Sequence, residues 1–120
     1  MLMSYILDAS ATRHNLDALA KLYLNYKTTT FEEVAGKGVK QITFDQVPLK
    51  LAGNYASEDA DITLRLYEKL NPLLNKKTSL KKLAEDIEIP LIEVLSDMEQ
   101  SGTLVNSKVL QAQSKDLGKR

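Results

Sequence analysis

Tyr55 and Asp59 are the residues of this sequence whose types and spacing best suit chemistry. They are four positions apart, so on a helix both side chains lie on one face, with Cβ atoms roughly 6 Å apart. Aspartate is unfavourable inside a helix and is seldom buried without a partner. Yet Asp59 shares its predicted face with the small or apolar residues Ala52, Ala56, Thr63 and Leu66.

A carboxylate in that setting could bind a cation, and the neighbouring phenol could orient a water molecule for attack on a phosphodiester. Oxygen ligands suit Mg²⁺ or Mn²⁺, and two such ions can stabilise the attacking and leaving oxygens of an in-line displacement. The same spacing also arises by chance, and an exposed aspartate on a long helix is usually only solvated. The pattern alone leaves both interpretations open.

Composition excludes several other chemistries. The 120 residues contain sixteen basic and sixteen acidic side chains, so no polybasic surface is expected. The absence of cysteine excludes a disulfide scaffold, a thiolate zinc site and a cysteine nucleophile. His14 is the single histidine, which excludes a multi-histidine metal site within one chain. No apolar run approaches the roughly 18 residues of a membrane span, and the first residues do not resemble a signal peptide. We therefore expect a cytoplasmic protein without a membrane partner.

Helices must position these side chains, because almost nothing in the sequence alternates with a period of two. Asn15 is a plausible N-cap for a helix over residues 16–26, and Thr30 with Glu33 fits a capping box that opens a short helix ending at Gly36. We predict further helices over residues 48–70, over 79–101 with a break near 88–89, and from 108 onwards, capped by Ser107. The fold class is therefore mainly α, with at most one short strand, at residues 103–105.

Two further predictions concern the helix that carries Tyr55 and Asp59. Asn71 and Pro72 are expected to stop the helix that carries Tyr55 and Asp59, which makes residues 71–78 the best candidate for a domain boundary. Glu58 and Asp61 are predicted to leave the Tyr55/Asp59 face and to be solvated.

Beyond the Tyr55/Asp59 pair, several stretches follow one another along nearly the whole chain. They are SYIL at 4–7, RH at 13–14, DALA at 17–20, KTTTFEEVAGKG at 27–38, TF at 43–44, YASEDAD at 55–61 and IPLIEVLSDME at 89–99, followed by Gly102. In this order they resemble the bacterial family A DNA polymerases. The resemblance implies that residues 1–75 are the C-terminal part of a ribonuclease-H-like 3′→5′ exonuclease domain, and that residues 76–120 begin the polymerase domain.

The same resemblance implies roles for four residues. Tyr55 would orient the attacking water, Asp59 would bind a metal ion, Arg13 would contact the single-stranded primer end, and Phe31 would pack against its terminal bases. The cofactor would be Mg²⁺ or Mn²⁺ in a two-metal site, and the partners would be DNA and the remainder of the polymerase chain. Three further carboxylates of that site would precede Met1, so we expect the isolated chain to be inactive.

Each role has a simpler alternative. From spacing alone, Phe31 fits a core position better, and Arg13 is an ordinary surface arginine. A ribonuclease-D-like exonuclease would share the Tyr-x-x-x-Asp helix and act on RNA. A helical adaptor could instead bind a protein through the apolar stripe of residues 80–98, and exposed apolar faces of that kind would also let the chain self-associate.

Overall fold

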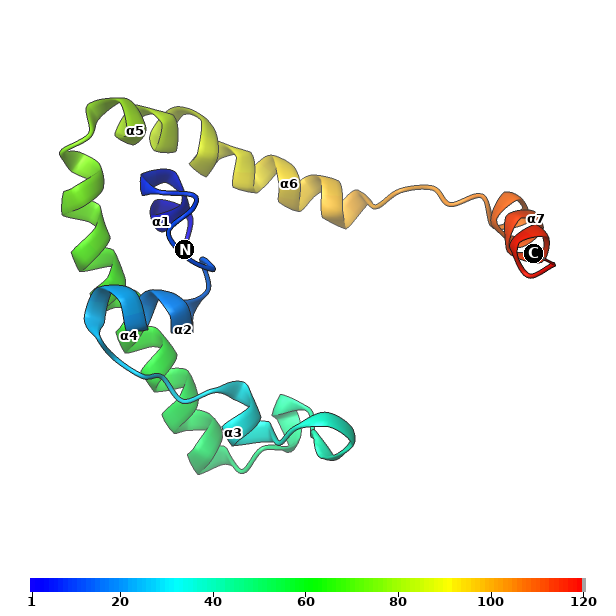
Figure 1. The fold of residues 1–120 in the computed structure, drawn as a ribbon, viewed down its shortest axis with the longest axis horizontal. Helices are drawn as coiled ribbons and strands as arrows, with labels where there is room; N and C mark the ends of the chain where they lie inside the picture. Colours follow the sequence, from blue (N-terminus) through cyan, green and yellow to red (C-terminus); the bar gives the residue numbers. More distant parts are fainter. Residues whose placement is uncertain (120) are drawn as a thin grey trace. The chain divides into compact units, whose positions relative to one another are not determined.

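The computed structural model describes residues 1–119, which are mainly α-helical and contain no strand, so the predicted fold class is confirmed. Residues 103–105, which the sequence allows as one short strand, do not form a strand. Two compact units are present, Met1–Glu88 and Ile89–Arg120. The elements (Figure 1), in chain order, are α1 (Leu2–Leu7), α2 (Leu16–Leu19), the π-helical turn η1 (Ala20–Leu24), α3 (Phe31–Ala35), the 3-10 helices η2 (Gly38–Lys40) and η3 (Phe44–Gln46), α4 (Leu49–Asn75), α5 (Thr78–Leu83), the π-helical turn η4 (Ala84–Glu88), α6 (Ile89–Ser101) and α7 (Ser107–Leu117).

The long helix α4 is the element on which the first unit is built. Helices α1, α2, α3 and α5 all contact it, at successive positions along its length in Figure 1. Its buried residues recur every four positions, as expected for one face of an α-helix. The predicted face was partly wrong, because Ala56 and Thr63 are exposed. The buried residues of α4 are Ile62, Leu66, Leu70 and Leu74.

The predicted end of this helix at Asn71-Pro72 is also wrong, because α4 continues through Pro72 to Asn75. Proline removes a backbone donor and is costly inside a helix. The added turn places Leu74 on the buried face, where only 4% of it is exposed, and Pro72 itself lies on the exposed side. The burial of Leu74 thus outweighs the tendency of Asn71-Pro72 to end the helix.

Two apolar clusters hold α4 to the elements before it. In the first, Leu19 and Ala20 pack against Ile62 and Leu66. This cluster explains why residues 16–24 coil onto α4, with Asn25 in the left-handed region at φ 51° ending the turn. In the second, the buried residues are Val34, Ala35 and Val47, with Ala52 and Tyr55 of α4 packed against them.

Helix α3 begins and ends at the capping residues that the sequence predicted. The capping box is formed, since Thr30 accepts from the backbone of Glu33 and the Glu33 side chain accepts from the backbone of Thr30. Gly36 ends the helix at φ +84°, and a Cβ at this position would lie only 3.1 Å from the carbonyl oxygen of Lys40. The chain then returns to α3, where the Ile42 N–H donates to the Ala35 carbonyl at 2.9 Å.

The later elements follow the prediction more loosely. The regular helix from Thr78 is interrupted at η4, close to the expected break at 88–89. Asn106, rather than Ser107, caps α7 by accepting from the Val109 N–H. No residue of α6 or α7 in the described part of the chain is buried. None of the helices in residues 1–119 has the length and apolar character needed to cross a membrane.

Candidate active site

Tyr55 and Asp59 lie one turn apart in the first half of α4, and both side chains are half-buried. The ring of Tyr55 contacts two other aromatic rings that come from different elements. Its centroid is 6.4 Å from that of Phe31, the first residue of α3, and 5.9 Å from that of Phe44, the first residue of η3. These separations are typical of edge and tilted aromatic contacts. The structure therefore brings together Tyr55, Asp59 and Phe31, three of the four residues singled out in the sequence.

The surroundings of Asp59 disfavour its charged form. Burial raises the pKa of its carboxyl above the ordinary value of 3.8, and the negative charges of Asp17 and Glu58 raise it further. A hydrogen-bonding interaction with the Tyr55 hydroxyl acts in the opposite direction. A nearby cation would reverse the balance, because it stabilises the carboxylate.

The phenol of Tyr55 is kept in its neutral form. Burial raises its pKa above 10.0, and the charges of Asp59 and Asp17 add to the effect. A neutral phenol both donates and accepts hydrogen bonds, so it can hold a water molecule but does not act as a strong base near pH 7.

Asp17 is a neighbour of the pair that the site prediction missed. It lies in the first turn of α2, and its negative charge affects the pKa of both Tyr55 and Asp59. One carboxylate oxygen accepts from the Thr28 hydroxyl at 2.6 Å. Its position in the DALA stretch was visible in the sequence, but nothing local indicated that α2 would pack beside α4.

Glu58 contradicts the prediction that it would be a solvated charge. One oxygen of its carboxylate accepts from the Tyr26 hydroxyl at 2.7 Å, and the other accepts from the Thr29 N–H at 2.9 Å. These bonds lower the pKa of Glu58 below 4.5. Asp61 is exposed as predicted, and its carboxylate lies 3.5 Å from the guanidinium of Arg65 on the same helix.

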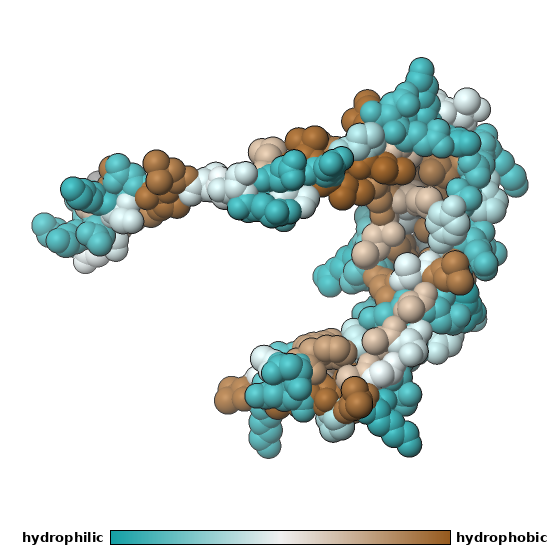
Figure 2. All heavy atoms as spheres, turned by 180° about the vertical axis from the view of Figure 1, so that it is seen from behind, coloured by the Kyte–Doolittle hydropathy of each residue, from teal (hydrophilic) through white to brown (hydrophobic). Residues whose placement is uncertain are grey.

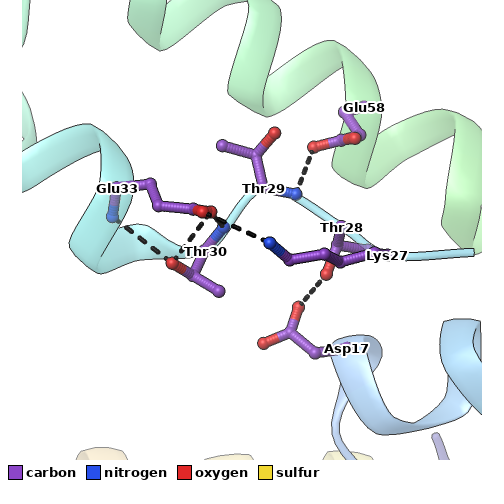
Figure 3. A network of polar contacts seen from close by, with 7 residues as sticks. All are labelled: Asp17, Lys27, Thr28, Thr29, Thr30, Glu33 and Glu58. Carbon is purple, nitrogen blue, oxygen red and sulfur yellow. Dashed lines mark hydrogen bonds and ion pairs between the residues drawn. The ribbon is translucent and has the colours of Figure 1, made fainter.

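Figure 3 shows how the segment before α3 is held between two helices. Asp17 of α2 binds Thr28 from one side, while Glu58 of α4 binds the backbone of Thr29 from the other. The capping box of Thr30 and Glu33 follows at once and leads directly into Phe31. An open pocket of about 370 Å³ lies against this segment, lined by Tyr26, Thr29, Val34, Leu51, Asn54, Tyr55, Glu58 and Asp61.

Arg13 lies outside this aromatic group. It is exposed on the segment between α1 and α2, next to His14. The His14 ring has a structural place, since its Nδ1 lies 3.1 Å from the hydroxyl of the buried Ser4 and its Nε2 donates to the Ala9 carbonyl at 3.1 Å. Phe31 is 38% exposed. It therefore does not fill a core position, although spacing alone favoured one.

Asp59 can supply one ligand of a metal site, but the side chains around it do not form a complete site. A half-buried carboxylate with a raised pKa is a suitable oxygen ligand for Mg²⁺ or Mn²⁺. However, no group of three or more His, Cys, Asp or Glu side chains within residues 1–119 is arranged to hold a metal ion. Further ligands must come from elsewhere if an ion is to be held tightly.

Comparison with known proteins identifies the family. The family model described as 3′-5′ exonuclease matches residues 1–75, which include α1 to α4 and therefore Tyr55 and Asp59. The chain belongs to this 3′-5′ exonuclease family. As a member of the family, it is similar over its whole length to DNA polymerase I of Pseudomonas aeruginosa, with 50% identity over 120 residues.

Other members show the same likeness. DNA polymerase I of Rhizobium leguminosarum is 40% identical over 117 residues, which is 98% of the chain, and that of Treponema pallidum is 40% identical over 111 residues, which is 92%. The chain spans only 11–13% of the length of these three relatives.

Proposed function

We propose that this chain is part of a bacterial DNA polymerase I and contributes Tyr55 and Asp59 to its 3′→5′ exonuclease site, which removes mispaired nucleotides from the primer end in the cytoplasm. The observation that carries the proposal is the match of the exonuclease family to residues 1–75, together with the juxtaposition of a neutral phenol and a half-buried carboxylate on α4. In this proposal residues 1–75 belong to the exonuclease domain and residues 76–120 begin the polymerase domain.

Asp59 supplies a ligand oxygen for the divalent ion. Mg²⁺ or Mn²⁺, when bound, supplies positive charge that stabilises the oxygens of the phosphodiester under attack. The carboxylate contributes only when it is ionised, and its pKa is raised by burial. A bound cation would stabilise this carboxylate and lower its pKa again.

Tyr55 holds the attacking water. Its raised pKa keeps the hydroxyl protonated, so it orients the water through hydrogen bonds and does not remove its proton. Its ring is fixed on two sides by Phe31 and Phe44, which limits the positions that the hydroxyl can take. Such fixed placement is the main way in which an orienting residue accelerates a reaction.

Substrate binding is assigned to Phe31 and Arg13. The exposed part of the Phe31 ring can stack on unpaired bases without selecting among them, and the Arg13 guanidinium can pair with a backbone phosphate. Both contacts favour a single-stranded 3′ end, which is what a mispaired primer terminus presents.

The proposal is tested by grafting. The 120-residue chain replaces the matching segment of the Pseudomonas aeruginosa DNA polymerase I, whose sequence it matches end to end. Release of a labelled, mispaired 3′ nucleotide is measured with Mg²⁺ and without nucleoside triphosphates. We expect the grafted enzyme to be active, Asp59→Ala to lower release by about 100-fold or more, and Tyr55→Phe by about 10- to 100-fold.

The control is Asp61→Asn, which changes an exposed carboxylate on the same helix and should leave release unchanged. Retention of full nuclease activity by Asp59→Ala would refute the proposal, and faster degradation of single-stranded RNA than of DNA would favour a ribonuclease-D-like function.

The isolated chain should release nothing, because one carboxylate cannot hold two ions. Release by the isolated chain that Asp59→Ala abolishes would show that its site is complete.

A further inference from the structure

Three aromatic rings from separate elements meet at the proposed site. Besides the contacts of Tyr55 already described, the centroids of Phe31 and Phe44 are 6.3 Å apart, with an angle of 36° between the ring planes. Phe44 is therefore as close to Tyr55 and Phe31 as they are to each other. The proposed function uses Phe44 only as a packing partner of the Tyr55 ring and assigns it no contact with DNA.

Three aliphatic side chains of this stretch fill the second apolar cluster, whereas Ile42 and the two aromatic rings stay partly accessible. Val34, Ala35 and Val47 are 7%, 2% and 6% exposed. Phe31 and Phe44, from the same stretch of chain, are 38% and 42% exposed despite their mutual contact. The two rings therefore pack at the edge of that cluster, with part of each ring open to a ligand.

The position of Phe44 is fixed by the backbone on both sides of it. On the N-terminal side, Ile42 is hydrogen-bonded to the last residue of α3. On the C-terminal side, the Val47 N–H donates to the Phe44 carbonyl at 3.2 Å, and the Val47 side chain is buried in the second apolar cluster. The ring is thus presented on a structured loop, which lowers the entropic cost of binding a ligand there.

We propose that Phe44 is a nucleotide-binding residue, and that the rings of Phe31 and Phe44 together form a stacking surface for unpaired bases of the primer 3′ end beside Tyr55. The inference rests on the proposed exonuclease function and extends it. Every base offers a π-face, so stacking is tolerant of sequence, and bases inside a duplex already stack on their neighbours. The surface would therefore recognise single-stranded ends of any sequence.

The grafted polymerase provides the test, with kcat and KM for a labelled single-stranded oligonucleotide measured separately. Phe44→Leu keeps an apolar side chain that can still pack against the ring of Tyr55 but removes the aromatic face, so we expect KM to rise about fivefold or more while kcat changes less than about twofold. Phe44→Tyr keeps the ring and should leave KM within about twofold of the unmodified graft. Ile42→Val is the matched control, since Ile42 is 37% exposed on the same loop, and it should not change KM.

A second measurement needs no substitution. Single-stranded DNA carrying 5-iodouracil near its 3′ end is bound to the graft in the presence of EDTA, irradiated and digested with trypsin. Cleavage after Lys40 and Lys50 leaves Phe44 as the only aromatic residue of peptide 41–50, just as Phe31 is the only one of peptide 28–37. We expect cross-links to both peptides, whereas cross-links to peptide 28–37 alone would overturn the proposal.

The outcomes separate the two proposals. If Asp59→Ala abolishes nucleotide release while Phe44→Leu leaves KM unchanged, the assignment of Phe44 is wrong and the exonuclease function stands. A fall in kcat without a rise in KM would mean that Phe44 only positions Tyr55, which also overturns the stacking role. If Asp59→Ala leaves release intact, the exonuclease function itself is wrong.

Discussion

Glu58 and Asp59 are consecutive carboxylates whose surroundings move their pKa values in opposite directions. The pKa of Glu58 is lowered because its side chain accepts hydrogen bonds from Tyr26 and Thr29. The pKa of Asp59 is raised because it is partly buried near other acids. The first arrangement is typical of a structural anchor, and the second suits the metal-ligand role that we propose for Asp59.

The anchoring role of Glu58 gives a prediction about stability. Glu58→Ala removes the acceptor for two hydrogen bonds and should lower the free energy of unfolding of the chain by about 1–3 kcal/mol. Glu58→Gln keeps one amide oxygen as an acceptor and should cost less. Urea unfolding followed by circular dichroism measures both. Asp61→Asn, at the neighbouring exposed carboxylate, should cost under about 0.5 kcal/mol, and an equal loss in that variant would contradict the anchoring role.

At this scale the sequence was informative only over short distances. The shared helical face of Tyr55 and Asp59 follows from their spacing, and the structure has both half-buried on α4. The partners of Glu58 lie 29 and 32 residues earlier in the chain, so no local pattern could have indicated them. The same holds for Asp17, which approaches Asp59 only because α2 packs on α4.

Among the elements, α3 shows how a five-residue helix is stabilised by its ends. Its capping box and its terminating glycine were both predicted, because each depends on residues within a few positions of one another. The end of α4 was not predicted, because it depends on burial of Leu74 against other parts of the chain. Local signals thus locate helix ends well only where tertiary packing does not compete with them.

The cap of α3 should make the stability of the chain depend on pH. The pKa of Glu33 is lowered below 4.5, mainly because its carboxylate accepts from the backbone and hydroxyl of Thr30. A carboxyl with a lowered folded-state pKa contributes stability above its unfolded pKa and loses it as pH falls through the folded one. The melting temperature of the chain should therefore exceed that of Glu33→Gln at pH 7, and the difference should shrink below about pH 4.5.

Melting curves followed by circular dichroism between pH 3 and pH 7 measure this difference. Glu32→Gln is the control, because Glu32 forms an exposed ion pair with Lys37 and takes no part in the capping box. A difference between the unmodified chain and Glu33→Gln that stays constant over the whole range would contradict the role given to the cap.

For the molecule as a whole, the two compact units differ in how far their apolar side chains are buried. The first unit buries leucines and isoleucine along α4, whereas no residue of α6 is buried. Brown, hydrophobic residues accordingly appear on the surface along α6 in Figure 2. The exposed residues of α6 include Ile89, Leu91, Ile92, Val94, Leu95 and Met98.

We expect this exposure to cause self-association of the chain when it is studied alone. The weight-average mass in sedimentation experiments should rise with protein concentration, and the chain should bind an apolar dye. The double variant Ile92→Glu/Leu95→Glu should reduce both effects. Gln100→Glu, which adds charge at a polar position of the same helix, should change them little, and a chain that stays monomeric at all concentrations without binding dye would refute the expectation.

The contact between α1 and α4 has a practical consequence for how this chain can be shortened. Helix α1 contributes no side chain to the proposed site, so a truncated protein beginning at Arg13 would retain every residue assigned a role here. It would also lose a cover of α4, the helix on which Asp59 stands. Proteolytic removal of the first dozen residues should therefore loosen the packing on α4 and weaken the proposed site from a distance, although every residue assigned to that site would remain.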